Sequence, residues 1–258
     1  MADTSQFIRY AADGPVARVT LNRPPLHVMN LEMLAEMDAA LAKAESQDDV
    51  AIVVLESRGG RAFSAGVDVA DHVLARVDKM LARFHTVLRR LIGWDRLSVA
   101  VVHGPALGGG CELAACCDLV YAAEGASFGQ PEITLGCFPP AAAALFPMML
   151  PRPKAAELVL TGRRWTAPEA ERAGLVTRTF PNTELRGEVD AIVRDLAEQS
   201  PAVLRVMRRA FGAGGREAAL HALAQSEQLY RDQLMKLEDM QEGVTAFIEK
   251  RDPVWKNR

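Results

Sequence analysis

Two glutamates in apolar sequence are the residues of this chain whose type and placement best suit acid–base chemistry. Glu112 follows three glycines and has cysteine, leucine and alanine as neighbours, while Glu132 follows Gly-Gln-Pro. Burial among apolar side chains raises the pKa of a carboxyl group towards neutral pH. Two such groups facing one water molecule could share its protons, one accepting a proton and the other donating one.

Two glycine-containing loops follow segments that we predict to be buried strands. Residues 61–68 read Arg-Ala-Phe-Ser-Ala-Gly-Val-Asp, and Gly108-Gly109-Gly110 opens a predicted short helix. Glycine permits unusual backbone angles and lets a ligand approach main-chain N–H groups closely. Free N–H groups at the start of a helix favour an anion or a developing oxyanion. The two loops are therefore candidates for binding a negatively charged oxygen.

Each feature also has a simpler structural interpretation. Glycine-rich turns after strands are common, and a glutamate in the first turn of a helix often only stabilises the helix dipole. The sequence contains neither G-x-G-x-x-G nor G-x-x-x-x-G-K-[ST], so nicotinamide and nucleoside triphosphate sites lose their main support. A Ser-His-Asp triad around Ser64 is disfavoured because the histidines are scattered, at His27, His72, His85, His103 and His221.

Length, composition and charge describe an ordinary globular chain. Its 258 residues suffice for one large domain, or for a domain with a small appendage. Apolar residues make up 49% of the chain and charged residues 24%, which is the balance of a protein with a full core. The net charge of −3 indicates neither nucleic acid nor an acidic membrane surface as a partner.

The cysteines and the N-terminus indicate a cytoplasmic protein. The cysteines lack C-x-x-C spacing and nearby histidine pairs, so buried free thiols are a better interpretation than zinc ligands: Cys111, Cys116, Cys117 and Cys137. The first residues lack the basic-then-apolar pattern of a signal peptide. No apolar run is long enough to span a bilayer. We therefore expect no membrane partner and no metal.

The order of predicted elements favours the α/β class. Apolar or alternating runs predict strands at residues 16–21, 51–56 and 98–103. Apolar residues at helical spacing predict helices at residues 31–46 and 75–92. Strands that alternate with helices are typical of α/β proteins. After residue 182 the pattern is almost entirely helical, with helices predicted at 184–199, 201–211, 216–238 and 241–250.

Taken together, the motifs resemble the crotonase family, the enoyl-CoA hydratases and isomerases. The resemblance runs almost from end to end and rests on the combination of motifs in order. It covers Leu-Asn-Arg-Pro at 21–24, Ala-Phe-Ser-Ala-Gly-Val-Asp at 62–68, Gly-Pro-Ala-Leu-Gly-Gly-Gly-Cys-Glu-Leu-Ala at 104–114, Phe-Gly-Gln-Pro-Glu at 128–132, Leu-Thr-Gly at 160–162, Ala-Glu-Arg-Ala-Gly-Leu-Val at 170–176 and Glu-Gly-Val-Thr-Ala-Phe-Ile-Glu-Lys-Arg at 242–251.

The resemblance implies a spiral of repeated ββα turns with a helical C-terminal region. Residues 1–195 would form the core with the acyl-CoA site, and residues 196–258 would form the helical region that takes part in trimer contacts. A homotrimer or a dimer of trimers is the implied assembly. No separate cofactor is implied, because coenzyme A is part of the substrate.

The resemblance also assigns roles to four residues. The backbone N–H groups of Val67 and Gly109 would bind the thioester oxygen. Hydratases of the family carry both glutamates, whereas isomerases, dehalogenases and decarboxylases commonly lack one or both. We therefore favour addition of water to an enoyl-CoA, with Glu132 donating the α-proton and Glu112 acting as base. Isomerase or hydrolase activity on a related thioester, and a non-catalytic acyl-CoA-binding protein, are the alternatives.

The same resemblance predicts the residues that contact the substrate. The predicted substrate-binding residues are Ala65, Gly66, Asp68, Val69, Gly108, Gly110, Phe138, Pro139, Phe247 and Lys250. The candidates for covering the acyl chain are Leu74, Met80, Phe84 and Leu88.

The segment at 136–144 departs from the family pattern. It reads Gly-Cys-Phe-Pro-Pro-Ala-Ala-Ala-Ala where relatives with linear substrates often have a glycine-rich stretch. Together with the segment at 63–72, it is similar to the cyclohexa-1,5-diene-1-carbonyl-CoA hydratases. The ordinary short-chain enoyl-CoA hydratases are the direct alternative.

Overall fold

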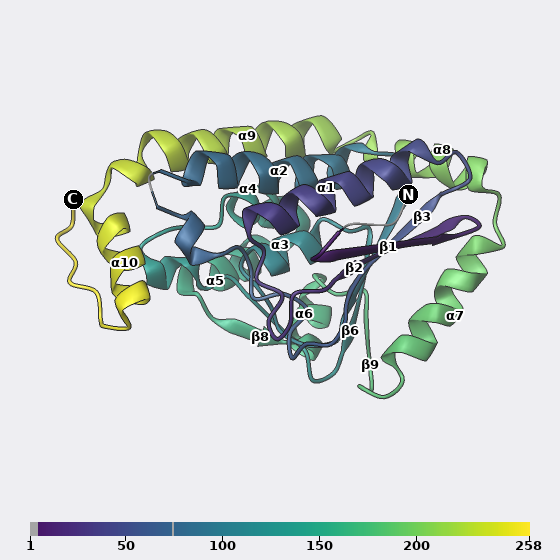
Figure 1. Ribbon diagram of the computed structural model, residues 1–258, viewed down its shortest axis with the longest axis horizontal. Helices are drawn as coiled ribbons and strands as arrows, with labels where there is room; N and C mark the ends of the chain where they lie inside the picture. Colours follow the sequence, from purple (N-terminus) through teal and green to yellow (C-terminus); the bar gives the residue numbers. More distant parts are fainter. Residues whose placement is uncertain (1–4, 74) are drawn as a thin grey trace.

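The central feature of the fold is a six-stranded sheet. The computed structural model describes residues 5–73 and 75–258 (Figure 1). The strands of this sheet run in the spatial order β1-β2-β3-β4-β6-β9. Strands β1 and β2 pair antiparallel, and every other neighbouring pair in this sheet is parallel. The strands are β1 (Ile8–Asp13), β2 (Val16–Leu21), β3 (Ile52–Ser57), β4 (Leu97–Val102), β6 (Leu119–Ala123) and β9 (Arg178–Phe180).

The predicted strands are confirmed to within one residue. Every residue of β3 is buried, as its unbroken apolar run indicates for a parallel strand covered on both faces. Strand β1 was not predicted. Only Ile8 among its six residues is fully buried, because β1 lies at the edge of the sheet and so lacks a continuous apolar pattern.

A second sheet of three short strands positions the two glutamates. Its order is β5 (Ala106–Leu107), β7 (Ser127–Gly129) and β8 (Arg164–Thr166), with β5 and β7 parallel. Leu107 at the end of β5 pairs with Gly129 at the end of β7. Parallel neighbours end at the same edge of a sheet. Helix α3 (Gly109–Ala115), which carries Glu112, and the 3₁₀ helix η2 (Pro131–Leu135), which carries Glu132, therefore begin side by side.

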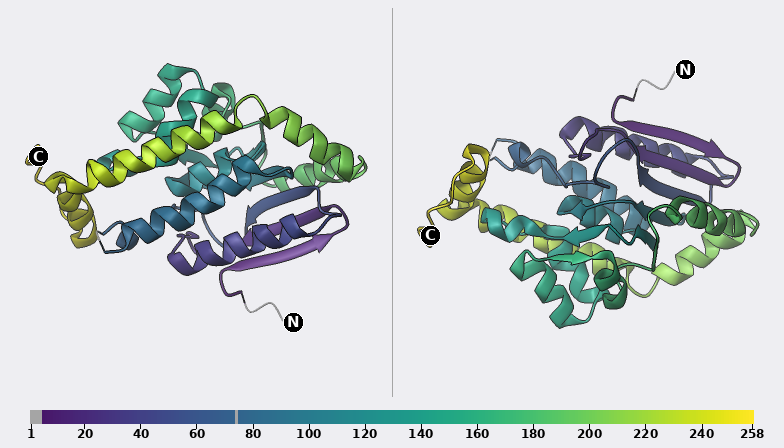
Figure 2. Two further views of the ribbon diagram at one scale, coloured as in Figure 1. Left: turned by 90° about the horizontal axis from the view of Figure 1, so that it is seen from above. Right: turned by 90° about the horizontal axis from the view of Figure 1, so that it is seen from below.

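Three long helices cover one side of the main sheet. Helices α1 (Leu31–Ser46), α2 (Val77–Gly93) and α9 (Arg216–Asp232) lie next to one another (Figures 1 and 2). The helices predicted at 31–46 and 75–92 are thus confirmed. The remaining helices are α4 (Pro140–Met149), α5 (Arg152–Thr161), α6 (Ala167–Ala173), α7 (Leu185–Ala197), α8 (Pro201–Gly212) and α10 (Glu238–Glu249).

The prediction of one helix across 216–238 is wrong after Asp232. A 3₁₀ turn, η3 (Leu234–Lys236), separates α9 from α10. The change of direction places Met235 and Met240 in an apolar cluster with Tyr230, so burial of these side chains outweighs continuation of the helix. Helix α10 then lies at one end of the molecule (Figure 1).

The α/β class with a helical C-terminal region is confirmed. The predicted boundary at 195 and 196 falls inside α7, and the division into two regions stays a prediction, as does the trimer. Within the described residues, no helix is both long and apolar enough to cross a membrane.

Candidate active site

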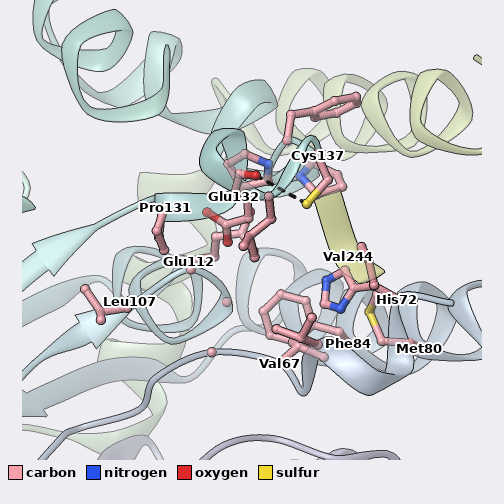
Figure 3. Close-up of a pocket in the computed structure, with 18 of the residues that line it drawn as sticks. Val67, His72, Met80, Phe84, Leu107, Glu112, Pro131, Glu132, Cys137 and Val244 are labelled. Carbon is pink, nitrogen blue, oxygen red and sulfur yellow. Dashed lines mark hydrogen bonds between the residues drawn. The ribbon is translucent and has the colours of Figure 1, made fainter. Parts of the chain in front are cut away.

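Glu112 and Glu132 face one cavity of about 360 Å³ (Figure 3). The cavity is bounded by the loop at 65–69, the start of α3, η2 and the segment that enters α4. Helices α2, α9 and α10 complete its wall. The two carboxylates that the sequence analysis singled out therefore do come together, from segments that are 20 residues apart.

Glu112 is held by the start of another helix. Its side chain is buried, and Oε1 accepts a hydrogen bond of 2.7 Å from the backbone N–H of Ala142, in the first turn of α4. Burial raises the pKa of Glu112 to about 7, although the N–H groups of Ala141 and Ala142 oppose this shift. Those N–H groups stabilise the ionised form, so Glu112 is the member of the pair better prepared to carry a charge.

The Glu132 carboxyl has a different environment, because its Oε2 atom accepts no hydrogen bond from the described residues. Pro131 begins the 3₁₀ helix η2, and Oε2 of Glu132 is buried with no hydrogen-bond partner within the described part of the chain. Burial raises the pKa of Glu132 to about 8, and the neighbouring carboxyl of Glu112 contributes further. Glu132 is therefore the member of the pair that favours the protonated form near neutral pH.

Two backbone N–H groups close to the carboxyl groups have no acceptor among residues 5–73 and 75–258. They belong to Val67 and Gly109, which both line the cavity. The strand-like bridge between Met29 and Val67 uses the neighbouring groups instead, because Met29 donates to the Gly66 carbonyl at 2.8 Å and Asp68 donates to the Met29 carbonyl at 3.0 Å. The two N–H groups are therefore free within the described residues, and their binding of one ligand oxygen stays a prediction.

Glycines at two positions allow the loop at 65–69, the start of α3 and the Glu132 carboxyl to approach one another closely. Gly66 has a φ of +98°, and a Cβ atom added there would lie 2.9 Å from the Leu107 carbonyl oxygen and 3.3 Å from the Gly109 nitrogen. Gly108 has a φ of +51°, and an added Cβ atom would overlap Oε1 of Glu132. Both contacts require glycine, since the left-handed conformation and the lack of space each exclude a larger side chain.

Most of the predicted site residues line the cavity. These are Ala65, Gly66, Val67, Val69, Met80, Phe84, Gly108, Gly109, Glu112, Glu132, Phe138, Pro139 and Phe247. Their contact with a substrate stays a prediction.

Five predicted residues are not among those that line it. The Asp68 carboxylate caps the 3₁₀ helix η1 (Val69–Asp71) by accepting from Ala70 at 3.1 Å, and Gly110 packs against the Ser64 carbonyl. Lys250 is exposed at the end of α10, and Leu88 is buried in the core. Leu74 lies outside the described residues.

Much of the cavity wall was not predicted from the sequence. The unpredicted lining residues include His72, Leu81, His85, Cys137, Pro140, Arg164, Tyr230 and Val244. Leu81 and His85 are four residues apart on α2, so helical spacing from the predicted Met80 and Phe84 could have suggested them. Tyr230 and Val244 belong to helices whose apolar stripes do not distinguish a cavity wall from the core. In the described part of the chain, no three metal-binding side chains gather at one point.

Comparison with known proteins gives a consistent result. A family model described as enoyl-CoA hydratase/isomerase matches residues 11–258. The chain is 34% identical to a probable enoyl-CoA hydratase of Mycobacterium tuberculosis over 258 residues, which cover 99% of this chain and 100% of the relative. It is 36% identical to a probable enoyl-CoA hydratase of Rhizobium meliloti over 254 residues, covering 95% and 96%.

Solved structures show the same fold. The crystal structure of an enoyl-CoA hydratase from Mycobacterium avium subsp. paratuberculosis superposes with a TM-score of 0.88 at 28% identity, covering 98% of this chain and 99% of that chain. A structure of an enoyl-CoA hydratase/isomerase from Xanthobacter autotrophicus gives a TM-score of 0.85 at 31% identity, covering 96% and 98%. The spiral fold predicted from the sequence is thereby confirmed.

The contact between Gly108 and Glu132 can be tested by a single substitution. We expect Gly108→Ala to lower the free energy of unfolding by more than Gly59→Ala does, because Gly59 also has a positive φ but an added Cβ there meets open space. The control should cost about 1 kcal/mol from backbone strain alone. Urea denaturation of both variants measures the difference, and equal costs would show that Glu132 does not pack against Gly108.

The raised pKa of Glu132 makes stability depend on pH. A carboxyl group whose pKa is raised from 4.5 by folding contributes stability that is complete below pH 4.5 and is lost as pH rises through the folded pKa of about 8. We expect Glu132→Gln, which cannot ionise, to be more stable than the natural chain at pH 8.5 by roughly 2 kcal/mol. The gain should shrink towards pH 5.

Urea denaturation at pH 5, 7 and 8.5 provides the measurement. The partly exposed Glu157 is the control, because its pKa is lowered by Lys154, with a further contribution from Arg163. Glu157→Gln should show no gain in stability at high pH. A gain for Glu132→Gln that is the same at all three pH values would contradict the raised pKa.

Proposed function

The chain belongs to the enoyl-CoA hydratase/isomerase family, and we propose that it adds water across the α,β double bond of an unsaturated acyl-CoA thioester. The observation that carries this proposal is the pair of buried carboxyl groups at one cavity, beside two backbone N–H groups without acceptors in the described chain. Coenzyme A enters as part of the substrate, so hydration in this form needs no separate cofactor.

In this proposal the N–H groups of Val67 and Gly109 bind the thioester oxygen. When water attacks the β-carbon, negative charge develops on that oxygen as an enolate. Fixed donors in a site that excludes water stabilise such a charge by about 3 kcal/mol each, by analogy with measured oxyanion holes. Because Gly109 is the first residue of α3, the dipole of the helix adds to the effect.

The environments of the two glutamates support different roles for them. The hydrogen bond from Ala142 favours an ionised Glu112. This carboxylate would take a proton from the water molecule while the water oxygen bonds to the β-carbon. The unpaired Oε2 of Glu132 favours a protonated carboxyl, which would give its proton to the α-carbon. After the reaction Glu112 holds one proton and Glu132 none, so exchange between them, or through water, restores the starting state.

The segment that leads into α4 supports a compact acyl group. Phe138 meets the ring of Tyr230 edge-on at 5.2 Å between centroids, and Pro139 and Pro140 lead into α4. Two successive prolines fix the backbone where a glycine-rich loop would adapt to a long chain. We therefore propose a cyclic dienoyl-CoA such as cyclohexa-1,5-diene-1-carbonyl-CoA as the finer candidate, with a short linear enoyl-CoA as its alternative.

Turnover on two substrates tests the reaction and the acyl group together. We expect the purified protein to add one water to cyclohexa-1,5-diene-1-carbonyl-CoA faster than to crotonyl-CoA, because the rigid wall suits a ring. Loss of the conjugated-thioester absorbance and the product mass report the reaction. Preference for crotonyl-CoA would contradict the cyclic candidate. A product without added water would contradict hydration and indicate an isomerase or hydrolase, and binding without any turnover would indicate a non-catalytic protein.

The division of roles predicts a bell-shaped pH profile. The reaction needs one ionised and one protonated carboxyl, so the rate should fall at low pH, where both carboxyls are protonated, and at high pH, where both are ionised. With pKa values raised to about 7 and about 8, we expect the maximum between these values. Glu112→Gln and Glu132→Gln should each reduce kcat by about 10³-fold.

Proton exchange separates the two roles. In D₂O, a saturated acyl-CoA can exchange its α-proton without addition of water, so exchange should be lost in Glu132→Gln and retained in Glu112→Gln. Glu157→Gln, a surface change, should leave both exchange and turnover unaltered. Loss of α-proton exchange in Glu112→Gln alone would reverse the assignment.

A further inference from the structure

Two polar side chains that the proposed reaction does not use line the same cavity without a protein partner. The hydroxyl of Tyr230 in α9 and the Nε2 atom of His85 in α2 are buried and make no hydrogen bond within residues 5–73 and 75–258. Tyr230 is 1% exposed and His85 is 0% exposed. A buried polar group without a hydrogen bond destabilises the protein, so a ligand that supplies a partner to each atom is favoured.

The surroundings of His85 identify Nε2 as an acceptor. Its Nδ1 atom lies 3.5 Å from Oε1 of Glu227, which is also paired with Arg89 and Arg231. Burial lowers the pKa of His85, so the ring is neutral at neutral pH. Burial alone would raise the pKa of Glu227, but His85 and the two arginines lower it, so Glu227 is ionised. At 3.5 Å Nδ1 makes no hydrogen bond with this carboxylate, but the negative charge beside it favours the tautomer with the proton on Nδ1. That tautomer leaves a lone pair on Nε2.

Tyr230 is a hydrogen-bond donor at the cavity. Burial raises the pKa of its hydroxyl well above the ordinary value, with Cys137 contributing next, so the group keeps its proton. The Cys137 thiol beside it donates at 3.4 Å to the backbone oxygen of Glu132. Sulfur is a weak acceptor, so the contact with Cys137 leaves the Tyr230 proton available to an oxygen atom of a ligand.

The donor and the acceptor belong to one part of the wall. Helices α2 and α9 run side by side (Figure 2). Glu227, which lies 3.5 Å from His85, is one turn before Tyr230 on the same face of α9. The other side chains that these elements and their neighbours place at the cavity are mainly apolar: Met80, Leu81, Phe84, Phe138 and Val244. A ligand is therefore met here by one donor and one acceptor within an apolar surface.

We propose that the acyl group of the substrate carries a hydroxyl group, which accepts a hydrogen bond from Tyr230 and donates one to Nε2 of His85. This inference rests on the proposed function only in that the cavity holds an acyl-CoA. A hydroxyl is both donor and acceptor, so it satisfies both atoms. A carbonyl oxygen or an ionised carboxylate has no proton to donate and would leave Nε2 unpaired. The carbon skeleton can be linear or cyclic.

Binding and turnover of matched acyl-CoA pairs test the proposal. Saturated 5-hydroxypentanoyl-CoA and 6-hydroxyhexanoyl-CoA are compared with pentanoyl-CoA and hexanoyl-CoA by calorimetry, and the corresponding 2-enoyl-CoA thioesters are compared by kcat/KM. We expect the better of the two hydroxylated compounds to bind at least tenfold more tightly than its parent and to be hydrated with at least tenfold higher kcat/KM. Equal affinity of every hydroxylated compound and its parent would overturn the proposal.

Three variants assign the preference to the two side chains. Tyr230→Phe removes only the hydroxyl and should abolish the preference by weakening binding of the hydroxylated compound. His85→Asn keeps an amide donor near Glu227 but removes the acceptor at Nε2, and should also reduce the preference. Tyr121→Phe, in β6 and outside the cavity, is the control and should retain it.

The outcomes separate this proposal from the reaction. If Tyr230→Phe lowers turnover of hydroxylated and parent substrates equally, Tyr230 serves the common chemistry and the proposal is wrong. If the binding preference is found but no water is added to any enoyl-CoA, the hydroxyl site stands and hydration fails. If water is added without any preference, hydration stands and the hydroxyl site fails.

Discussion

Two carboxyl groups buried against one small cavity cannot both ionise at low cost, and this constraint governs the rest of the site. Burial raises the pKa of each group, and Glu112 raises that of Glu132 further. The pair therefore shares about one proton near neutral pH, which is the state that acid–base chemistry on water requires. The geometry behind it is the pairing of β5 with β7, because Leu107 and Gly129 align the starts of the two segments that carry the glutamates. A shift in that register would separate the carboxyl groups and remove their mutual influence.

Main-chain groups, more than side chains, fix the remaining geometry of the site. At Gly66 two main-chain segments are in contact, and at Gly108 the main chain contacts the side chain of Glu132. A Cβ atom at either position would not permit these distances. Ala142 contributes only an N–H group, yet that group decides which carboxyl is better stabilised as an anion. Main-chain donors held by secondary structure reorganise little when charge develops, so they suit a site where charge moves during reaction.

The predictable part of the site is the part that lies within short sequence motifs. Glu112, Glu132, Val67 and Gly109 could be predicted because each lies in or next to a glycine-containing motif, and the resemblance of these motifs to the crotonase family implied their roles. Tyr230 and His85 could not, since their helices show the apolar spacing of ordinary core helices and only the packing of α2 against α9 turns them towards the cavity. The end of α9 was also unpredictable, because burial of Met235 and Met240 is a tertiary effect. Lys250 is the opposite case. Its motif predicted a contact with the substrate, but within this chain its side chain lies at the surface.

The division of the cavity between two sets of elements has a consequence for how activity and selectivity can vary. The proposed reacting groups come from the loop at 65–69, the start of α3 and η2, held by the sheets. The polar atoms of Tyr230 and His85 come from α9 and α2, which pack on the outside of that framework. A substitution on the helices can therefore change which acyl group is held without moving the carboxyl pair. The two parts meet at Cys137, whose thiol contacts the backbone of Glu132 on one side and lies beside Tyr230 on the other. Because Cys137 is buried and small, it couples the positions of Glu132 and Tyr230 and carries no charge between them. A hydroxyl bound by Tyr230 would thus fix the acyl chain relative to Glu132, so that selectivity for the acyl group and alignment of the α-carbon would depend on the same contact.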